Sequence, residues 1–118
     1  MSPRYDLEKR TFEFAKNVRV FVRKLKLDIS NVEDAKQLIR ASGSVGANYI
    51  EANESLSKKD FRHRLKICRK EAKESRYWLR LINVFEQKTL EDGQEHLINE
   101  SEEFVKIFSS ILNKTERT

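Results

Sequence analysis

Apolar residues recur every three or four positions over almost the whole of this chain, and that spacing is typical of one face of an α-helix. The pattern predicts four helices, at about residues 6–27, 32–55, 58–86 and 90–113. Only 3 glycines and 1 proline occur among the 118 residues, which favours long helices over sheets. Connectors of about 2–6 residues favour antiparallel neighbours. The sequence therefore predicts an all-α fold in a single domain over residues 1–118, an up-down-up-down antiparallel four-helix bundle.

Three helix starts are predicted from pairs of residues with the spacing of a capping box. In that motif the first side chain accepts a hydrogen bond from a backbone N–H that the new helix leaves unpaired. The pairs are Ser30 with Glu33, Ser57 with Asp60, and Thr89 with Asp92.

The second predicted helix contains two glycines, Gly43 and Gly46. Each costs about 1 kcal/mol relative to alanine inside a helix, so the pair predicts close approach of another element. A break or kink within residues 42–46 is the alternative. The segment lacks the Lys-Ser/Thr of a phosphate-binding loop, so helix packing is favoured over nucleotide binding. Two apolar stripes on this helix, and a second apolar flank on the third, favour self-association.

Basic residues of the third predicted helix alternate at spacings of three and four. On a helix they would form one row of roughly 32 Å. Ten basic and three acidic residues lie within 56–85, so the row is expected to have an anionic partner. The row consists of Lys59, Arg62, Lys66, Arg69, Lys73, Arg76 and Arg80.

Two kinds of anion suit this row. RNA or DNA phosphates would give salt-dependent binding without strong sequence preference, and Tyr77 beside the row would either stack on an unpaired base or serve packing. Alternatively, the protein is an interaction scaffold, in which carboxylates of the same subunit, a neighbouring subunit or an acidic protein partner neutralise the row. Glu91, Glu95 and Glu102 are the candidates within the chain.

The histidines and the cysteine form no recognisable metal or catalytic motif. His63 and His96 belong to no HExxH, Glu-x-x-His or Cys/His cluster. Cys68 falls on the apolar stripe of the third helix, where a buried, unreactive thiol is expected.

Paired carboxylates at helical spacing, Glu51 with Glu54 and Glu71 with Glu74, favour solvated or salt-bridged faces over acid–base catalysis. We therefore expect a non-enzymatic protein without a metal or cofactor. No apolar run of 18 or more residues indicates a membrane span, and no apolar N-terminal region indicates an export signal, so a cytoplasmic location is expected.

Residues 37–52 (QLIRASGSVGANYIEA), 59–61 (KDF) and 70–79 (KEAKESRYWL) resemble bacterial four-helix-bundle proteins, a family that includes proteins encoded in intervening sequences of large-subunit ribosomal RNA genes. The resemblance covers nearly the whole chain. It implies an up-down bundle that assembles into a homopentameric ring, and a distant relationship to retroelement accessory proteins that bind nucleic acid and a reverse transcriptase. It implies no catalytic residues.

Eight residues are expected to serve helix packing or assembly. The resemblance implies packing or polar networks between helices for Ser42, Gly46, Asn48, Glu51 and Glu74. The apolar pattern adds Gly43, Tyr49 and Trp78.

Overall fold

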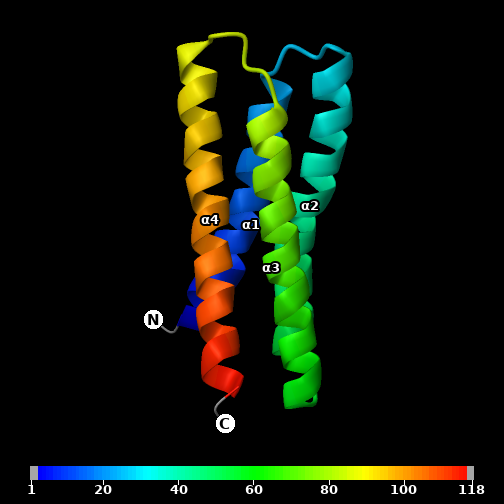
Figure 1. The fold of residues 1–118 in the computed structure, drawn as a ribbon, viewed down its shortest axis with the longest axis vertical. Coiled ribbons are helices and arrows are strands. Elements are labelled where there is room, and N and C mark those ends of the chain that lie inside the picture. Colours follow the sequence, from blue (N-terminus) through cyan, green and yellow to red (C-terminus); the bar gives the residue numbers. More distant parts are fainter. Residues whose placement is uncertain (1–2, 117–118) are drawn as a thin grey trace.

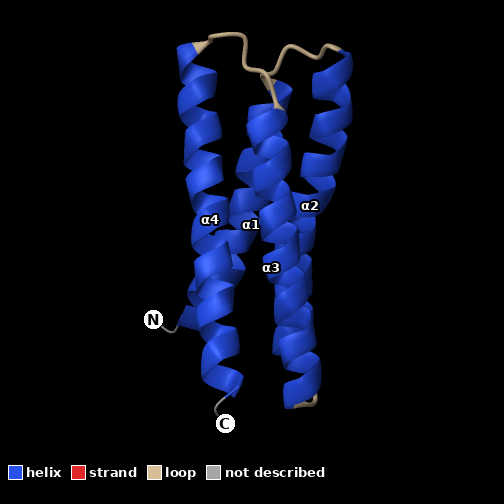
Figure 2. Cartoon of the chain, viewed as in Figure 1, coloured by secondary structure: helices blue, strands red, loops and turns tan. Residues whose placement is uncertain are grey.

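Four helices make up the fold of the chain (Figure 1). The computed structural model describes the backbone of residues 3–116 and the side chains of residues 7–116. The helices are α1 (Pro3–Arg23), α2 (Ile29–Asn53), α3 (Lys58–Leu81) and α4 (Lys88–Glu116). Between them the described chain forms loops and turns but no strand (Figure 2). The all-α prediction is confirmed.

Successive helices run in opposite directions and pack side by side, and α4 returns to lie against α1 (Figure 1). The resulting bundle measures 48 × 26 × 19 Å. The α1–α2 and α3–α4 loops lie at one end, and the α2–α3 turn lies at the other. This arrangement is the up-down-up-down order that the short connectors predict.

The core consists of the apolar stripes that the sequence pattern identifies. Phe14 of α1 meets Phe104 of α4 edge to face, with ring centres 5.3 Å apart. Tyr49 of α2 reaches Phe108 of α4 across the core, at 6.1 Å between ring centres. Burying aromatic and aliphatic side chains in this way supplies most of the driving force for folding.

Ser57 caps α3 as predicted, because its Oγ accepts a hydrogen bond from the Asp60 backbone N–H at 3.0 Å. The predicted start of α2 at Ser30 and Glu33 is wrong. Asp28 is the cap, and its Oδ1 accepts from the Asn31 N–H at 2.8 Å. The earlier carboxylate satisfies that N–H, so the helix begins at Ile29.

The start of α4 also differs from the prediction. The helix begins at Lys88, which places Thr89 and Asp92 inside its first turns rather than at its cap. The Asp92 carboxylate instead forms an ion pair with Lys88 Nζ at 3.1 Å.

Helix α3 ends at Leu81, not near residue 86, because a buried side chain from another helix holds the chain after it. The Asn31 side chain accepts from the Asn83 N–H and donates to the Asn83 and Lys26 carbonyls. Phe85 and Glu86 then adopt positive φ values, which a right-handed helix does not allow. Asn31 thereby fastens the two loops at this end of the bundle to one another.

Helix α2 is continuous through both glycines, so the alternative of a break within 42–46 is wrong. A Cβ on Gly46 would lie 3.0 Å from Thr11 Oγ1 and 3.3 Å from Thr11 Cβ, which confirms close approach by α1. A Cβ on Gly43 would meet only Arg19 Nη2, at 3.6 Å. The space beside Gly46 is therefore much tighter than the space beside Gly43.

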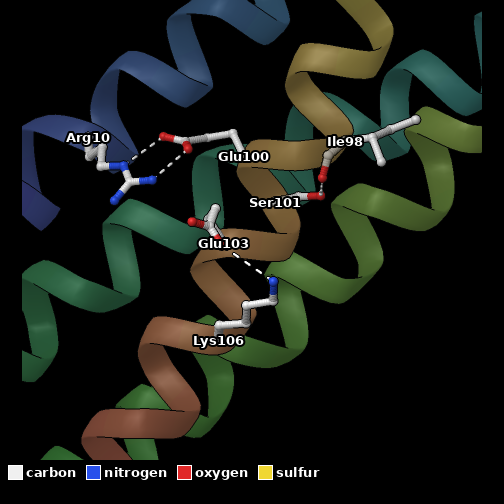
Figure 3. Close-up of polar contacts among 6 residues, drawn as sticks. All are labelled: Arg10, Ile98, Glu100, Ser101, Glu103 and Lys106. Carbon is white, nitrogen blue, oxygen red and sulfur yellow. Dashed lines mark hydrogen bonds and ion pairs between the residues drawn. The ribbon is translucent and has the colours of Figure 1, made fainter.

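The α1–α4 seam is held by a forked ion pair (Figure 3). Arg10 donates from Nε and Nη2 to the two carboxylate oxygens of Glu100, at 2.9 and 2.8 Å. The Arg10 guanidinium also lies 5.5 Å from the centre of the Phe104 ring. On the same stretch of α4, the buried Ser101 hydroxyl donates a hydrogen bond to the Ile98 carbonyl at 2.6 Å, so its partner lies within its own helix.

Candidate nucleic-acid interface

The basic row of α3 splits into two columns with different surroundings. Members of each column are seven residues apart, and the two columns are about 50° apart around the helix. The inner column, Arg62, Arg69 and Arg76, turns toward α4 and is half-buried. The outer column, Lys59, Lys66, Lys73 and Arg80, is exposed.

Two arginines of the inner column bind polar groups on α4. Arg62 donates from Nη1 to the Leu112 carbonyl at 2.5 Å and to Thr115 Oγ1 at 2.6 Å. Arg69 donates from Nη1 to Ser109 Oγ at 3.2 Å. These bonds tie the two side chains to the bundle.

Arg76 makes the one contact of the row with a carboxylate in the described part of the chain. Its Nη1 lies 3.4 Å from Glu102 Oε2, and both side chains are about 40% exposed. A pair this exposed contributes only about 0–1 kcal/mol. Glu91 and Glu95, the other predicted partners, are exposed and form no ion pair with the row within residues 7–116.

The outer column belongs to a longer exposed stripe that carries no carboxylate. In order along α3 the stripe consists of Lys59, His63, Lys66, Lys70, Lys73, Tyr77 and Arg80. Among the described residues, none of its cations forms an ion pair or a side-chain hydrogen bond. At the start of α3, Lys58, Lys59, Arg62, His63 and Lys66 surround an open hollow of about 550 Å³. This outer stripe is an unneutralised positive surface.

Polar side chains link α2 to the opposite flank of α3. Asn48 donates to the Ser44 carbonyl and to Ser44 Oγ, both at 2.9 Å, and accepts from Arg64 Nη1 at 3.1 Å. Ser42 is fully buried and donates to the Ile39 carbonyl. Asn48 thus joins α2 to α3, whereas the Ser42 hydrogen bond stays within α2.

Three further residues of the predicted packing set differ in burial. Glu51 is exposed. Tyr49 lies in the core, and Trp78 is half-buried.

A cavity of about 150 Å³ between α2 and α3 holds the Glu71 and Glu74 pair. Arg40 and Trp78 also line it. Burial raises the pKa of Glu71 above its ordinary value, and the neighbouring Glu74 carboxylate raises it further. Glu74 Oε2 is buried and has no hydrogen-bond partner in the described chain.

Cys68 is fully buried in the core, and burial raises the pKa of its thiol to about 12. The thiol therefore stays protonated near neutral pH and cannot act as a nucleophile.

His63 and His96 are both exposed, on different helices. No cluster of three or more potential metal ligands occurs among the described residues. No helix within the described residues is both long enough and apolar enough to cross a membrane.

An apolar groove lies on the opposite side of α2, between that helix and α1. It has a volume of about 190 Å³ and includes Phe12, Gly43, Ala47 and Ile50. The Phe12 side chain is 60% exposed and that of Ile50 is 54% exposed.

Comparison with known proteins gives a family and a fold neighbour. The model of the 23S rRNA-intervening sequence protein family matches residues 4–110. The chain is also similar to a crystal structure from Bacteroides thetaiotaomicron, described as a protein with unknown function from the S23 ribosomal protein family, with 28% identity and a TM-score of 0.79. That match covers 95% of this chain and 99% of the other. The comparison with curated proteins gave no match. With a family model that matches nearly all of its length, the chain belongs to the 23S rRNA-intervening sequence protein family.

Proposed function

We propose that this protein is a non-enzymatic helical bundle that binds RNA or DNA through phosphate contacts. The outer stripe of α3 supports the proposal, because its cations are exposed and have no acidic partner within the described chain. Lysine and arginine side chains on such a surface displace the counterions of a nucleic acid, which makes binding favourable at low salt. Contacts of this kind carry little sequence information.

The division of the row supports the outer column as the part that binds. Lys59, Lys66, Lys73 and Arg80 are free to meet phosphates at intervals of roughly 10.5 Å along the helix. The inner arginines already bind α4, so they position α3 against its neighbour. The family description connects its members with ribosomal RNA genes, which makes structured RNA the first ligand to test.

A salt titration of RNA binding tests the proposal. We expect the double variant Lys66→Gln, Lys73→Gln to bind structured RNA, single strands and duplexes more weakly, and to lower the slope of log affinity against log salt by about 2. The matched control is Lys9→Gln with Lys16→Gln, two exposed lysines with the same spacing on α1. The control should bind as the original protein does. The proposal would be refuted if the original protein showed no salt-dependent binding to structured RNA, to single strands and to duplexes alike.

We also propose that the protein forms a homo-oligomer in the cytoplasm, with five subunits in a ring. The open α1–α2 groove supports self-association, and the ring size comes from the family resemblance. Ile50→Lys would place a charge in the groove and is expected to release single subunits, as measured by native mass spectrometry. Val20→Lys, on the α1–α4 side, is the control that should leave the assembly intact. A single-chain mass for the original protein at micromolar concentration would contradict the proposal.

Native mass spectrometry also distinguishes nucleic-acid binding from the alternative of a protein-interaction scaffold. If acidic groups of a neighbouring subunit neutralise the outer column, the Lys66 and Lys73 variant will lose subunits in the absence of nucleic acid. If an acidic protein partner does so, the original protein will assemble normally and bind no nucleic acid.

A further inference from the structure

Tyr77 is an exposed aromatic ring within the positively charged outer stripe. Its side chain is 58% exposed, whereas Tyr49 on α2 is buried in the core. Its hydroxyl makes no hydrogen bond within the described part of the chain. One face of this ring is therefore left open to solvent.

The Tyr77 ring is held in place by its neighbour. Its centre lies 5.0 Å from that of Trp78, and the planes meet at 80°, an edge-to-face contact that aromatic pairs prefer. Trp78 is half-buried and lines the α2–α3 cavity. A ring supported on one side loses less side-chain freedom when a second group packs on its open face.

Cations lie on both sides of this ring along the helix. Lys73 is one turn before Tyr77 and Arg80 is about one turn after it, so roughly 6 Å and 4.5 Å of helix separate them from the ring. All three side chains are exposed, and no carboxylate lies on the stripe between them. A strand whose phosphates meet Lys73 and Arg80 would bring the intervening sugar and base over the Tyr77 side chain.

We infer that Tyr77 is a stacking site for an unpaired base, so the outer stripe takes single-stranded RNA or DNA, or an unpaired loop of a structured RNA, in preference to a continuous duplex. This inference rests on the proposed function. Bases inside a duplex are stacked on one another and present no open face to a ring on a helix surface, whereas any unpaired base does. The cations supply affinity for phosphate, and Tyr77 adds affinity only for strands with a free base.

The test compares an oligouridylate of about 12 nucleotides with an RNA duplex of similar length, using fluorescence anisotropy on the full chain. We expect Tyr77→Ala to weaken binding of the oligouridylate roughly tenfold and to leave duplex binding unchanged. Tyr77→Phe, which keeps the ring, should bind both as the original protein does. Leu81→Ala, an exposed apolar neighbour without a ring, is the matched control and should have no effect.

Trp78 supplies an independent signal, because it is the only tryptophan in the chain. A base stacked on Tyr77 lies beside this indole, so the oligouridylate should quench its fluorescence and the duplex should not. Tyr77→Ala should abolish the difference between the two ligands.

Two results would overturn the inference while leaving the proposed function intact. One is that Tyr77→Ala binds the oligouridylate with unchanged affinity, and the other is that it loses the same affinity for the oligouridylate and the duplex. In both cases binding would still depend on salt and on Lys66 and Lys73. A change of oligomeric mass in Tyr77→Ala, without nucleic acid present, would instead identify the ring as a subunit contact. If the original protein binds neither ligand at low salt, the inference and the proposed function both fail.

Discussion

Gly43 and Gly46 occupy similar positions in the sequence but have different neighbours in the fold. Gly46 faces the backbone and side chain of Thr11 on α1, while Gly43 faces only the end of the Arg19 side chain. A glycine in mid-helix is unfavourable by itself, so only the packing at Gly46 compensates for its cost.

Alanine substitutions should therefore have opposite effects at the two glycines. Gly46→Ala should lower the free energy of unfolding by about 1–3 kcal/mol, because its methyl group would have to displace Thr11. Gly43→Ala should raise it by about 0.5–1 kcal/mol through better helix propensity. Urea denaturation at one protein concentration, with the oligomeric mass checked for each variant, measures both. Equal destabilisation by the two substitutions would contradict this account.

At the scale of the element, α3 presents four different sides to its surroundings. Its core side is apolar, its α4 side carries the inner arginines, and its α2 side carries Glu71 and Glu74 in a cavity. The outer stripe between the two polar sides is left to solvent. One helix thereby contributes to the core, to two helix seams and to the candidate interface.

The Glu71 carboxyl should make stability depend on pH. Its pKa is raised above the ordinary value of 4.5, first by burial and then by Glu74, so the folded state binds the proton more tightly than the unfolded state does. Stability contributed by this group is therefore present at low pH and is lost as pH rises through the raised pKa. We expect Glu71→Gln to gain stability relative to the original protein at pH 7, and that gain to shrink toward pH 4.5.

Melting temperatures of both proteins across this range measure the effect. Glu95→Gln removes an exposed carboxylate on α4 and is the control for the loss of one negative charge. A difference between Glu71→Gln and the original protein that stays constant over the whole range would argue against a titrating Glu71.

At the scale of the whole molecule, the bundle closes where α4 meets α1. Open hollows of about 230 and 180 Å³ lie along this seam. The Arg10 and Glu100 fork spans the same seam, with side chains 32% and 21% exposed (Figure 3). This partial burial and the two parallel bonds make the pair stronger than an ordinary surface ion pair.

A double-mutant cycle should detect this difference. Arg10→Gln and Glu100→Gln, alone and together, should give a coupling energy of about 1 kcal/mol in chemical denaturation. Lys36 and Glu33 on α2 provide the comparison, since their side chains are 68% and 67% exposed and their coupling should be at most about 0.5 kcal/mol. Equal coupling in the two pairs would show that the fork does not stabilise the closure of the bundle.

Much of this architecture follows from the sequence because helix formation and amphipathic patterning are local. The spacing of apolar residues was enough to predict four helices and their core faces, and the Ser57 cap depends only on residues of its own turn. The end of α3 was not predictable in this way. It depends on Asn31, which is 52 positions away in the chain and binds Asn83 only in the folded bundle.

The same distinction applies to the candidate interface. That seven cations share one side of α3 follows from the sequence alone, because a helix repeats every 3.6 residues. Which of them are free depends on the packing of α4 against α3, since Arg62, Arg69 and Arg76 find acceptors on α4 while Lys59, Lys66, Lys73 and Arg80 do not. About 50° of rotation separates the two columns, and this small angle matters only once a neighbouring helix lies against one of them.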